Sequence, residues 1–560
     1  MSRNVLRYYK RLIGPVVTTT VVILATAGTA LGQPVEDKKV TASDGDAGDA
    51  FGQAVWIDGD TAVIGAYFAD HDGPPVLANA GSAYIFQEDW FGARWGEVAI
   101  LRAEFPDAED RFGASVSISV DTAIVGAPRD DGAGTDLGAA YIFDRDEGGN
   151  DEWDQVVKII APDADPDDQF GWSVSINGSI AIVGAPFVGS DVGEAYIYYR
   201  DRGGLDNWGW VATLTASDGA RDDVFGWSVA VNGDLAIVGA PFENENGTNA
   251  GAAYVFGRDE GGTDNWGEVK KITAGDLNDE FGVAVAMSVD TALVGAENAG
   301  LGGTGGAGAA YVFEQDAGGT DNWGQVAKLT ASDGAVADAF GLSVSIRRRG
   351  AVVGAFGNNL ARGAAYLFRR PGGGWVNNTE NDKMTASDAA PFDAFGRSVA
   401  ISGDFAVMGA PGEDANGSSS GSGYVFESVC PCPWDLTGND KVGAVDLLIL
   451  LSAWGTDPGG PPDFDDSGFV GSTDLLALLV NWGLCPCVEG TPPLSLEDEM
   501  AEACLTMDDW DEFEAVMTDP ESSQEDKDRY ECWMRHYLED CSRCICTHPP
   551  VVCPSPDPFG

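Results

Sequence analysis

Short hydrophobic segments alternate with polar turns along most of the chain. One copy, "DQFGWSVSINGSIAIVGAP" at residues 168–186, has alternating apolar positions in "SVSI" and a continuous apolar run in "AIVGA", with the turn "NGS" between them. Alternation with a period of two indicates half-buried strands, and Asn-Gly favours a tight turn because both residues accept positive φ. The pattern therefore predicts a β-hairpin.

This hairpin recurs seven times with constant internal spacing. A Phe-Gly pair is followed 14 residues later by Gly-Ala in every copy, and the Phe-Gly pairs begin at residues 51, 112, 170, 225, 281, 340 and 395. An aromatic doublet such as Tyr254/Phe256 marks a third strand, and the segment from Trp266 marks a fourth. Four antiparallel strands per repeat predict one blade of a propeller, and seven blades close a ring without open sheet edges.

The chain supplies only six fourth strands that begin with Trp. These begin at Trp95, Trp153, Trp208, Trp266, Trp323 and Trp375. The N-terminal segment "DKKVTASD" at 37–44 is similar to "VAKLTASD" at 326–333, which follows Trp323. We predict that this segment completes the last blade and closes the ring.

Residues 37–427 resemble an FG-GAP repeat β-propeller, the domain at the head of integrin α chains and in many exported bacterial proteins. The resemblance rests on the seven equally spaced copies and implies binding and adhesion more often than catalysis. Several blades of that family carry a DxDxDG-type calcium loop between the strands of the two motifs. This chain has tight turns there, such as "SGDF" at 402–405, so those calcium sites are not expected.

Two sets of side chains within the repeats have alternative roles. An Asp stands two residues before each Phe, at Asp49, Asp110, Asp168, Asp223, Asp279, Asp338 and Asp393, and five copies add a second, at Asp44, Asp163, Asp218, Asp333 and Asp388. The favoured interpretation is that each Asp caps a turn by accepting backbone N–H groups, and the alternative is a ring of carboxylates that binds cations. The six Trp residues are interpreted as blade packing, with sugar stacking as the alternative.

The net charge limits the kinds of binding partner, and the N-terminal segment indicates where the protein is located. The chain has 32 basic and 89 acidic residues and a formal net charge of −57, which repels nucleic acid and anionic lipid. Residues 1–32 combine a basic start, an apolar stretch and the small residues "ALG". They predict a cleaved signal peptide and a secreted or cell-surface protein, with an uncleaved membrane anchor as the alternative. No later stretch is apolar enough to cross a membrane.

A pair of acidic loops follows the repeats. "DLTGNDKVGAVD" at 435–446 and "DFDDSGFVGSTD" at 463–474 each place oxygen-bearing residues at positions 1, 3, 5 and 12 and precede an apolar helix. Short oxygen side chains at alternate loop positions wrap a calcium ion, and the carboxylate at position 12 closes the far side. The predicted calcium ligands are Asp435, Thr437, Asn439, Asp446, Asp463, Asp465, Ser467 and Asp474.

The duplicated loops, with Asp at position 12, resemble a type I dockerin over about residues 433–484. The resemblance implies docking to a cohesin-type partner through loop positions 10 and 11, which are Ala444, Val445, Ser472 and Thr473. The first loop departs from the family pattern because Asp440 stands where Gly is usual.

All ten cysteines lie at or after Cys430. "CPC" at 430–432 and at 485–487 brackets the dockerin-like module, and disulfides are the natural role of these cysteines in an exported chain, with a zinc site as the alternative. The expected organisation is a signal peptide (1–32), a propeller (33–427), a dockerin-like domain (428–488) and an acidic, Cys-rich helical tail (489–560).

The sequence thus predicts a mainly β protein, an exported non-enzymatic binding protein with a calcium-dependent docking module. Only three histidines are present, so a Ser-His-Asp triad has little basis, and no catalytic residue is predicted. One alternative is a dockerin-tethered enzyme that degrades polysaccharides. The other is a structural surface protein whose calcium loops rigidify a stalk.

Overall fold

A computed structural model of the chain describes residues 34–427 apart from 72–75, 89–94, 133, 150–151, 275–276, 301–305, 348–349, 372–373 and 404. Beyond residue 427 it describes only 441–442, 447, 450–451, 478 and 483–484. The chain divides into two compact units, of which residues 33–431 with 487–489 form one. In the other unit, β30 (Lys441–Val442) pairs with β31 (Gly483–Leu484), and Leu447, Leu450 and Leu478 are buried. Within the described residues, no helix has the length and apolar character needed to cross a membrane.

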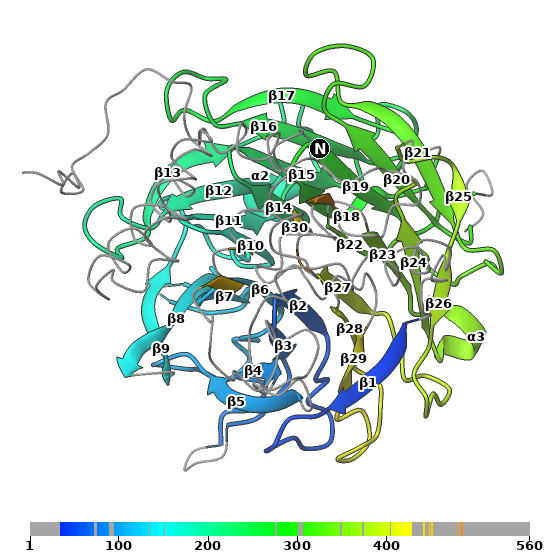
Figure 1. Ribbon diagram of the computed structural model, residues 1–560. Coiled ribbons are helices and arrows are strands. Elements are labelled where there is room, and N and C mark those ends of the chain that lie inside the picture. Colours follow the sequence, from blue (N-terminus) through cyan, green and yellow to red (C-terminus); the bar gives the residue numbers. More distant parts are fainter. Residues whose placement is uncertain are drawn as a thin grey trace, which may run out of the picture. The chain divides into compact units, whose positions relative to one another are not determined.

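The first unit is a seven-bladed β-propeller, as the repeats predict (Figure 1). Its sheets are blade 1, β2 (Ala54–Asp58), β3 (Thr61–Ala66), β4 (Ser82–Glu88) and β5 (Trp95–Leu101); blade 2, β6 (Ser115–Ser119), β7 (Thr122–Ala127), β8 (Ala139–Gly149) and β9 (Glu152–Ile159); blade 3, β10 (Ser173–Asn177), β11 (Ile180–Ala185), β12 (Glu194–Tyr199) and β13 (Gly209–Leu214); blade 4, β14 (Ser228–Asn232), β15 (Leu235–Ala240), β16 (Ala252–Gly257) and β17 (Gly267–Ile272); blade 5, β18 (Phe281–Ser288), β19 (Thr291–Ala296), β20 (Ala309–Glu314) and β21 (Gly324–Thr330); blade 6, β22 (Ser343–Arg347), β23 (Gly350–Ala355), β24 (Ala364–Arg369) and β26 (Asp382–Met384); and blade 7, β27 (Ser398–Ser402), β28 (Phe405–Ala410), β29 (Ser422–Glu427) and β1 (Val35–Val40).

The first strand of each blade lies nearest the propeller axis, and the fourth strand lies at the rim (Figure 1). The inner strands contact one another around a closed ring, and the last of them, β27, contacts β2. The loops between second and third strands differ in length, since the chain runs from Ala66 to Ser82 in blade 1 but only from Ala185 to Glu194 in blade 3. Loops therefore vary while the inner hairpins keep a constant register.

The N-terminal strand closes the ring, which confirms that prediction. β1 pairs antiparallel with β29 and so supplies the fourth strand of blade 7. Lys39 forms ion pairs of 2.7 Å with Asp388 and 2.8 Å with Glu413. Glu36 accepts hydrogen bonds from the backbone N–H and the hydroxyl of Ser387.

Blade 6 differs from the prediction of a regular fourth strand. From Trp375 to Met384 the chain is three residues longer than the equivalent path from Trp266 to Ile272. The extra residues form β25 (Asn378–Thr379), which pairs parallel with β21 of blade 5, and only β26 remains in blade 6. Two short turns, α2 (Val188–Asp191) and α3 (Asn358–Ala361), contain residues with positive φ and are not regular helices.

The repeated motif has a packing explanation. Each Phe of a Phe-Gly pair is buried edge-on against the aromatic doublet of its own blade, as in Phe225 with Tyr254 and Phe256 at 5.5 and 5.9 Å between ring centroids. Its backbone N–H bonds to the preceding blade, as in the 3.0 Å bond from Phe225 to Val192. Each Phe thus packs its ring in its own blade and bonds its backbone to the preceding blade. Both contacts must form together, which explains the constant spacing between Phe-Gly and Gly-Ala.

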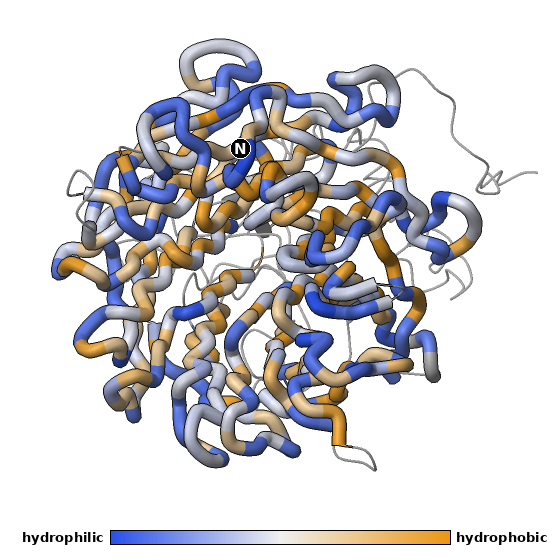
Figure 2. Tube along the Cα trace, turned by 180° about the vertical axis from the view of Figure 1, so that it is seen from behind, coloured by the Kyte–Doolittle hydropathy of each residue, from blue (hydrophilic) through white to orange (hydrophobic). Residues whose placement is uncertain are grey.

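The six Trp residues pack within the propeller. Their exposed fractions lie between 1% for Trp208 and 7% for Trp153. This confirms the packing interpretation and excludes an open sugar platform at these positions. Figure 2 shows the same division along the whole trace, with hydrophobic strand segments inside and hydrophilic turns at the periphery.

Candidate functional site

The aspartates that precede the Phe-Gly pairs cap turns. In Asp49, Asp110, Asp168, Asp223, Asp338 and Asp393, one carboxylate oxygen accepts a hydrogen bond of 2.6–2.9 Å from the backbone N–H three residues earlier. All seven aspartates are at most 5% exposed. The turn-capping interpretation is confirmed for these six, and the cation ring stays an alternative.

Burial of these carboxylates makes stability depend on pH. Burial raises the pKa of Asp49 to about 6 and that of Asp110 to about 7, and backbone hydrogen bonds offset this only in part. An unfolded Asp has a pKa of about 3.9, so the folded protein binds more protons between about pH 4 and pH 7. The stabilisation that protonation gives is complete below pH 4 and is lost as the pH rises through the folded pKa values.

We therefore expect the thermal unfolding temperature to be higher at about pH 5.5 than at about pH 8. Asp110→Asn keeps the acceptor oxygen and removes the charge, so it should reduce this difference and stabilise the protein at pH 8. Asp222→Asn, at an exposed carboxylate beside Asp223, is the control and should leave the difference unchanged. Differential scanning calorimetry measures both, and an Asp110→Asn profile identical to that of the original chain would contradict the prediction.

Four aspartates of the second set link neighbouring blades. Asp218 follows the last strand of blade 3 and accepts a 2.8 Å hydrogen bond from the hydroxyl of Tyr254 in blade 4. Lys271 of blade 4 lies 2.5 Å from the same carboxylate. Asp44, Asp333 and Asp388 bond the equivalent tyrosines of their own neighbouring blades. These residues therefore hold the connection between blades in place.

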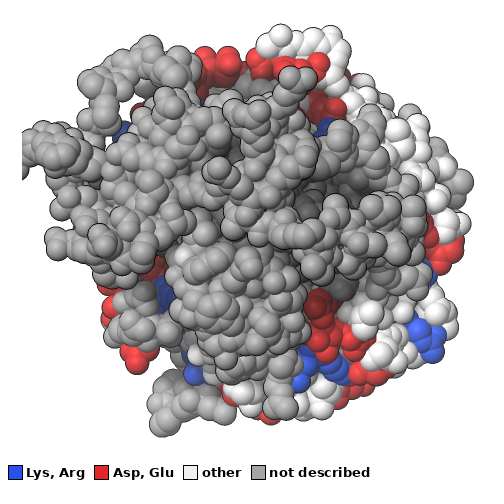
Figure 3. Space-filling model, in the orientation of Figure 1, with Lys and Arg blue, Asp and Glu red and all other residues white. Residues whose placement is uncertain are grey.

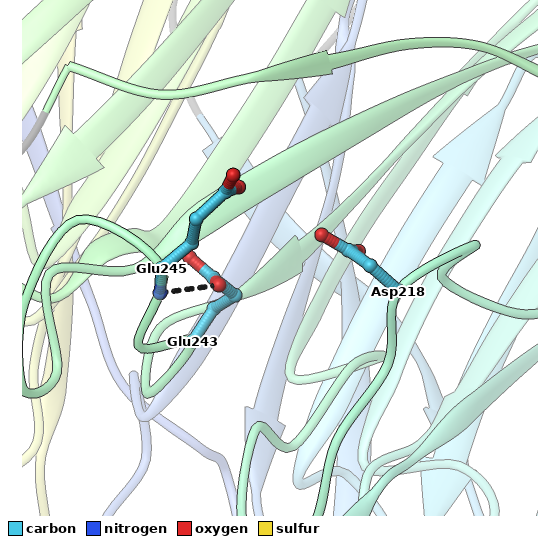
Figure 4. A group of neighbouring side chains, drawn as sticks. All are labelled: Asp218, Glu243 and Glu245. Atoms are coloured by element: carbon cyan, nitrogen blue, oxygen red, sulfur yellow. Dashed lines mark hydrogen bonds between the residues drawn. The ribbon is translucent and has the colours of Figure 1, made fainter.

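One group of three carboxylates within the described residues converges within 4.8 Å and has the composition of a metal site (Figure 4). It consists of Asp218, Glu243 and Glu245, and Glu243 is buried with Oε2 lacking a hydrogen-bond partner in the described structure. The ammonium of Lys271 lies 3.3 Å from Glu243 and 2.7 Å from Glu245.

The group is organised around this ammonium. Burial alone would lower the pKa of Lys271, but the hydrogen bonds to Asp218 and Glu245 and the charge of Glu243 raise it above its usual value. Burial alone would raise the pKa of Asp218, but the hydrogen bonds from Lys271 and Tyr254 hold it below its usual value. The group contains Asp218 of the second set of aspartates but none of the seven that precede Phe-Gly, and Lys271 supplies a cation to it.

A different set of side chains gathers at one end of the axis. The inner strand of each blade begins at or just after Phe-Gly, and the second strand ends at Gly-Ala, so the residues that flank Phe-Gly and those that follow Gly-Ala share that end. We call this end the axial mouth. It comprises Tyr67, Phe68, Arg111, Trp172, Phe187, Trp227, Phe242, Glu280, Glu297, Asn298, Phe356 and Arg397.

Aromatic side chains cover the mouth at blades 3 and 4. The rings of Trp172 and Trp227 lie 4.8 Å apart between centroids, and both are half-buried. Trp172 also contacts Phe187 at 5.3 Å, and Trp227 contacts Phe242 at 5.9 Å. Unlike the six Trp residues in the blade packing, this pair presents ring surface that is not enclosed by the core.

Charged side chains meet across the axis. Glu297 of blade 5 hydrogen bonds to Glu280, and burial together with the charge of Glu280 raises the pKa of Glu297 to about 7. Burial lowers the pKa of Arg397 of blade 7, and the charge of Glu297 opposes this effect. Because blade 6 separates these two blades, the interaction places both side chains at the axis.

The opposite end of the axis is bridged by an ion pair. Arg347 at the end of β22 in blade 6 lies 3.0 Å from Asp58 at the end of β2 in blade 1, and blade 7 lies between them. Asp58 also accepts a 2.9 Å hydrogen bond from the backbone N–H of Val120 in blade 2. The two ends of the axis thus differ, and the axial mouth is the candidate functional site.

The other predicted site residues lie outside the described residues. These are the calcium ligands Asp435, Thr437, Asn439, Asp446, Asp463, Asp465, Ser467 and Asp474 and the partner-binding residues Ala444, Val445, Ser472 and Thr473. The predicted signal peptide and the cysteines lie outside them too.

Sequence reasoning missed the axial mouth. The available signal was the residue after Phe-Gly, which is Trp in two adjacent copies but Gln, Ala, Val, Leu and Arg in the other five. A position whose residue type varies inside an otherwise regular repeat is not fixed by the packing of the blade, so its side chain is available for another role. Acidic side chains, with fewer basic ones, follow the described rim of the face in Figure 3.

The comparisons with known proteins agree with the repeat structure. A family model described as FG-GAP repeat matches seven segments of the chain, residues 34–86, 95–143, 153–198, 208–256, 266–313, 323–368 and 378–426. The comparison with curated proteins found no match.

Proposed function

Because the chain belongs to the FG-GAP repeat family, we propose that it is an exported, non-enzymatic binding protein whose propeller recognises a ligand at the axial mouth. The family and the closed seven-bladed ring support a binding or adhesion protein. The observation that carries the finer proposal is the mouth itself. It gathers a half-buried Trp pair and cross-axis charged groups at one end of the ring, while an ion pair bridges the other end.

The C-terminal part of the proposal rests on the sequence. The paired loops at 435–446 and 463–474 have calcium-ligand spacing, and residues 433–484 resemble a dockerin. We propose that this module binds calcium and attaches the propeller to a cohesin-type partner on a cell surface or scaffold. The resemblance of residues 1–32 to a signal peptide supports export, and it fits the disulfides proposed for the Cys-rich segments.

Affinity capture on the immobilised full chain tests the proposal. Secreted and surface proteins of the source are loaded with calcium, and bound proteins are released with chelator. We expect a partner that requires calcium and is lost when Asp463→Ala and Asp474→Ala are combined, because these changes remove two carboxylate ligands of the second loop.

The matched control for this capture lies in the propeller. Glu243→Gln and Glu245→Gln remove two carboxylates from the group around Lys271 and should leave the captured partner unchanged. Retention of every bound protein after chelation would contradict docking. The calcium loops would then favour the structural alternative, in which they rigidify a stalk.

The enzymatic alternative has one feature to examine, the carboxyl pair at the mouth. Glycoside hydrolysis needs two carboxyl groups about 5 Å or more apart, so that sugar or water fits between them. Glu280 and Glu297 hydrogen bond directly to each other, which is closer than this requirement. Turnover of labelled polysaccharides by the full chain, lost with Glu297→Gln, would favour the enzyme in spite of this geometry.

A further inference from the structure

Two arginines at the axial mouth form no ion pair with a described residue, although the charge of Glu297 acts on Arg397 from across the axis. The guanidinium of Arg111 lies 5.9 Å from the ring centroid of Tyr67 and 5.3 Å from that of Phe68. The guanidinium of Arg397 lies 5.4 Å from the ring centroid of Phe356. The Nε atom of Arg111 is buried and lacks a hydrogen-bond partner in the described part of the chain. Both cations therefore rest on aromatic faces.

Such arginines are unexpected in this chain, where 89 acidic residues face 32 basic ones. Many other basic side chains of the propeller form ion pairs with carboxylates. Those with ion pairs of 2.5–3.2 Å include Lys39, Lys158, Lys271, Lys383, Arg258 and Arg347. A desolvated cation without a counter-charge costs free energy. Both arginines are partly buried and form no ion pair with a described residue, so they are suited to contact an anionic ligand.

The two guanidiniums converge on one side chain. Burial raises the pKa of Tyr67, and the positive charges of Arg111 and Arg397 both act against that effect. Arg111 belongs to blade 2 and Arg397 to blade 7, so they approach Tyr67 of blade 1 from either side. The phenol hydroxyl therefore feels both positive charges, and a phenol can donate a hydrogen bond.

The carboxyl pair across the axis leaves Arg397 available. Glu297 has a pKa of about 7 and shares a hydrogen bond with Glu280, so near neutral pH the pair retains a proton. The pair then presents less negative charge to Arg397 than two ionised carboxylates would. No described carboxylate lies within ion-pair distance of the Arg397 guanidinium.

We propose that Arg111 and Arg397 bind an anionic group, a carboxylate or a sulfate, on a carbohydrate chain that also packs against Trp172 and Trp227. The inference rests on the proposed role of the propeller as the binding domain. Guanidinium groups match the planar oxygens of such anions with paired hydrogen bonds. The half-buried Trp rings at the same mouth offer the flat apolar surface on which sugar rings pack.

Isothermal titration calorimetry of the full chain provides the test, with four probes. These are oligogalacturonate, its methyl ester, a sulfated galactose oligosaccharide and a poly-glutamate peptide. We expect an anionic sugar to bind, and the stronger of the two identifies the anion. The methyl ester should bind at least about tenfold more weakly than oligogalacturonate if the carboxylate is the anion, because it keeps the sugar and loses the charge.

Variants assign that binding to the mouth. Arg111→Gln should weaken binding of the preferred anionic sugar at least about tenfold. Arg397→Lys keeps the charge of a mostly buried residue and should weaken binding through the loss of paired hydrogen bonds. Arg221→Gln is the control, because this exposed side chain meets only Asp222 at 3.6 Å, and its affinity should be unchanged.

Three results would overturn the inference. The first is that neither anionic sugar binds. The second is that Arg111→Gln and the original chain have equal affinity for every anionic sugar. The third is that poly-glutamate binds as strongly as the anionic sugars, which would indicate an acidic peptide in place of a carbohydrate. Capture by the calcium loops is measured separately, so loss of sugar binding with retained capture removes this inference alone. Loss of both would remove the proposed function as well.

Discussion

Replacement of Gly239 by alanine is expected to destabilise the propeller by about 3 kcal/mol or more, among the larger effects of a single substitution. A Cβ atom at this position would lie 2.0 Å from the carbonyl oxygen of Gly282 in the next blade. The same oxygen accepts a 2.8 Å hydrogen bond from Ser228, whose hydroxyl would itself lie 2.4 Å from the added Cβ, so a shift of either atom would break this bond. The expected readout is a fall of about 4 °C or more in the thermal unfolding temperature.

The matched control is Gly96→Ala in β5. A Cβ atom there meets nothing within 4 Å, and the backbone of Gly96 has no positive φ. Its unfolding temperature should change by less than about 1 °C, since surface substitutions seldom exceed about 0.5 kcal/mol. Equal behaviour of the two variants would show that the blades relax around an added methyl group and that the close approach is not required.

Removal of β1 is expected to have the largest effect on folding. A chain that begins at Ala42 loses the fourth strand of blade 7 and leaves β29 as an unpaired edge. It also loses the buried side chain of Val40 and both ion pairs of Lys39. We expect the unfolding temperature to fall by about 10 °C or more and the protein to associate through the open edge.

The comparison is with a chain that begins at Pro34, measured by calorimetry and by light scattering. Lys39→Met separates the contribution of the two ion pairs to stability from that of the strand pairing. Lys38→Met is its control, because Lys38 lies exposed on the same strand. Only the first should lower the unfolding temperature, by a modest amount. A shortened chain that stays monomeric with unchanged stability would show that three strands suffice for blade 7.

Much of the propeller could be predicted because each blade repeats the same local solution. Phe170 and Gly184 stand at fixed separation since both contact a neighbouring blade, and such contacts leave no freedom in spacing. The incomplete seventh repeat and the similarity of 37–44 to later fourth strands were enough to predict ring closure. The irregular blade 6 was not predicted, because the extra residues before Met384 change the pairing partner without removing Trp375 from the core.

The axial mouth depends on contacts that no local pattern contains. Glu297 and Arg397 are 100 positions apart, and only the closed ring brings them to the same axis. Likewise, Arg111 contacts Tyr67 through the packing of two blades. Repeat analysis identifies what the copies share, whereas the mouth consists of the positions at which they differ.

The unequal loops between second and third strands have an evolutionary consequence. They leave the inner hairpins at the Gly-Ala end, where the chain takes a long path from Ala66 to Ser82 and a short one from Ala185 to Glu194, without any change in the register of the strands. Insertions and substitutions there are therefore buffered from the fold. Proteins with this propeller can therefore change their ligand specificity through the loops of one blade at a time, while the blades themselves are retained.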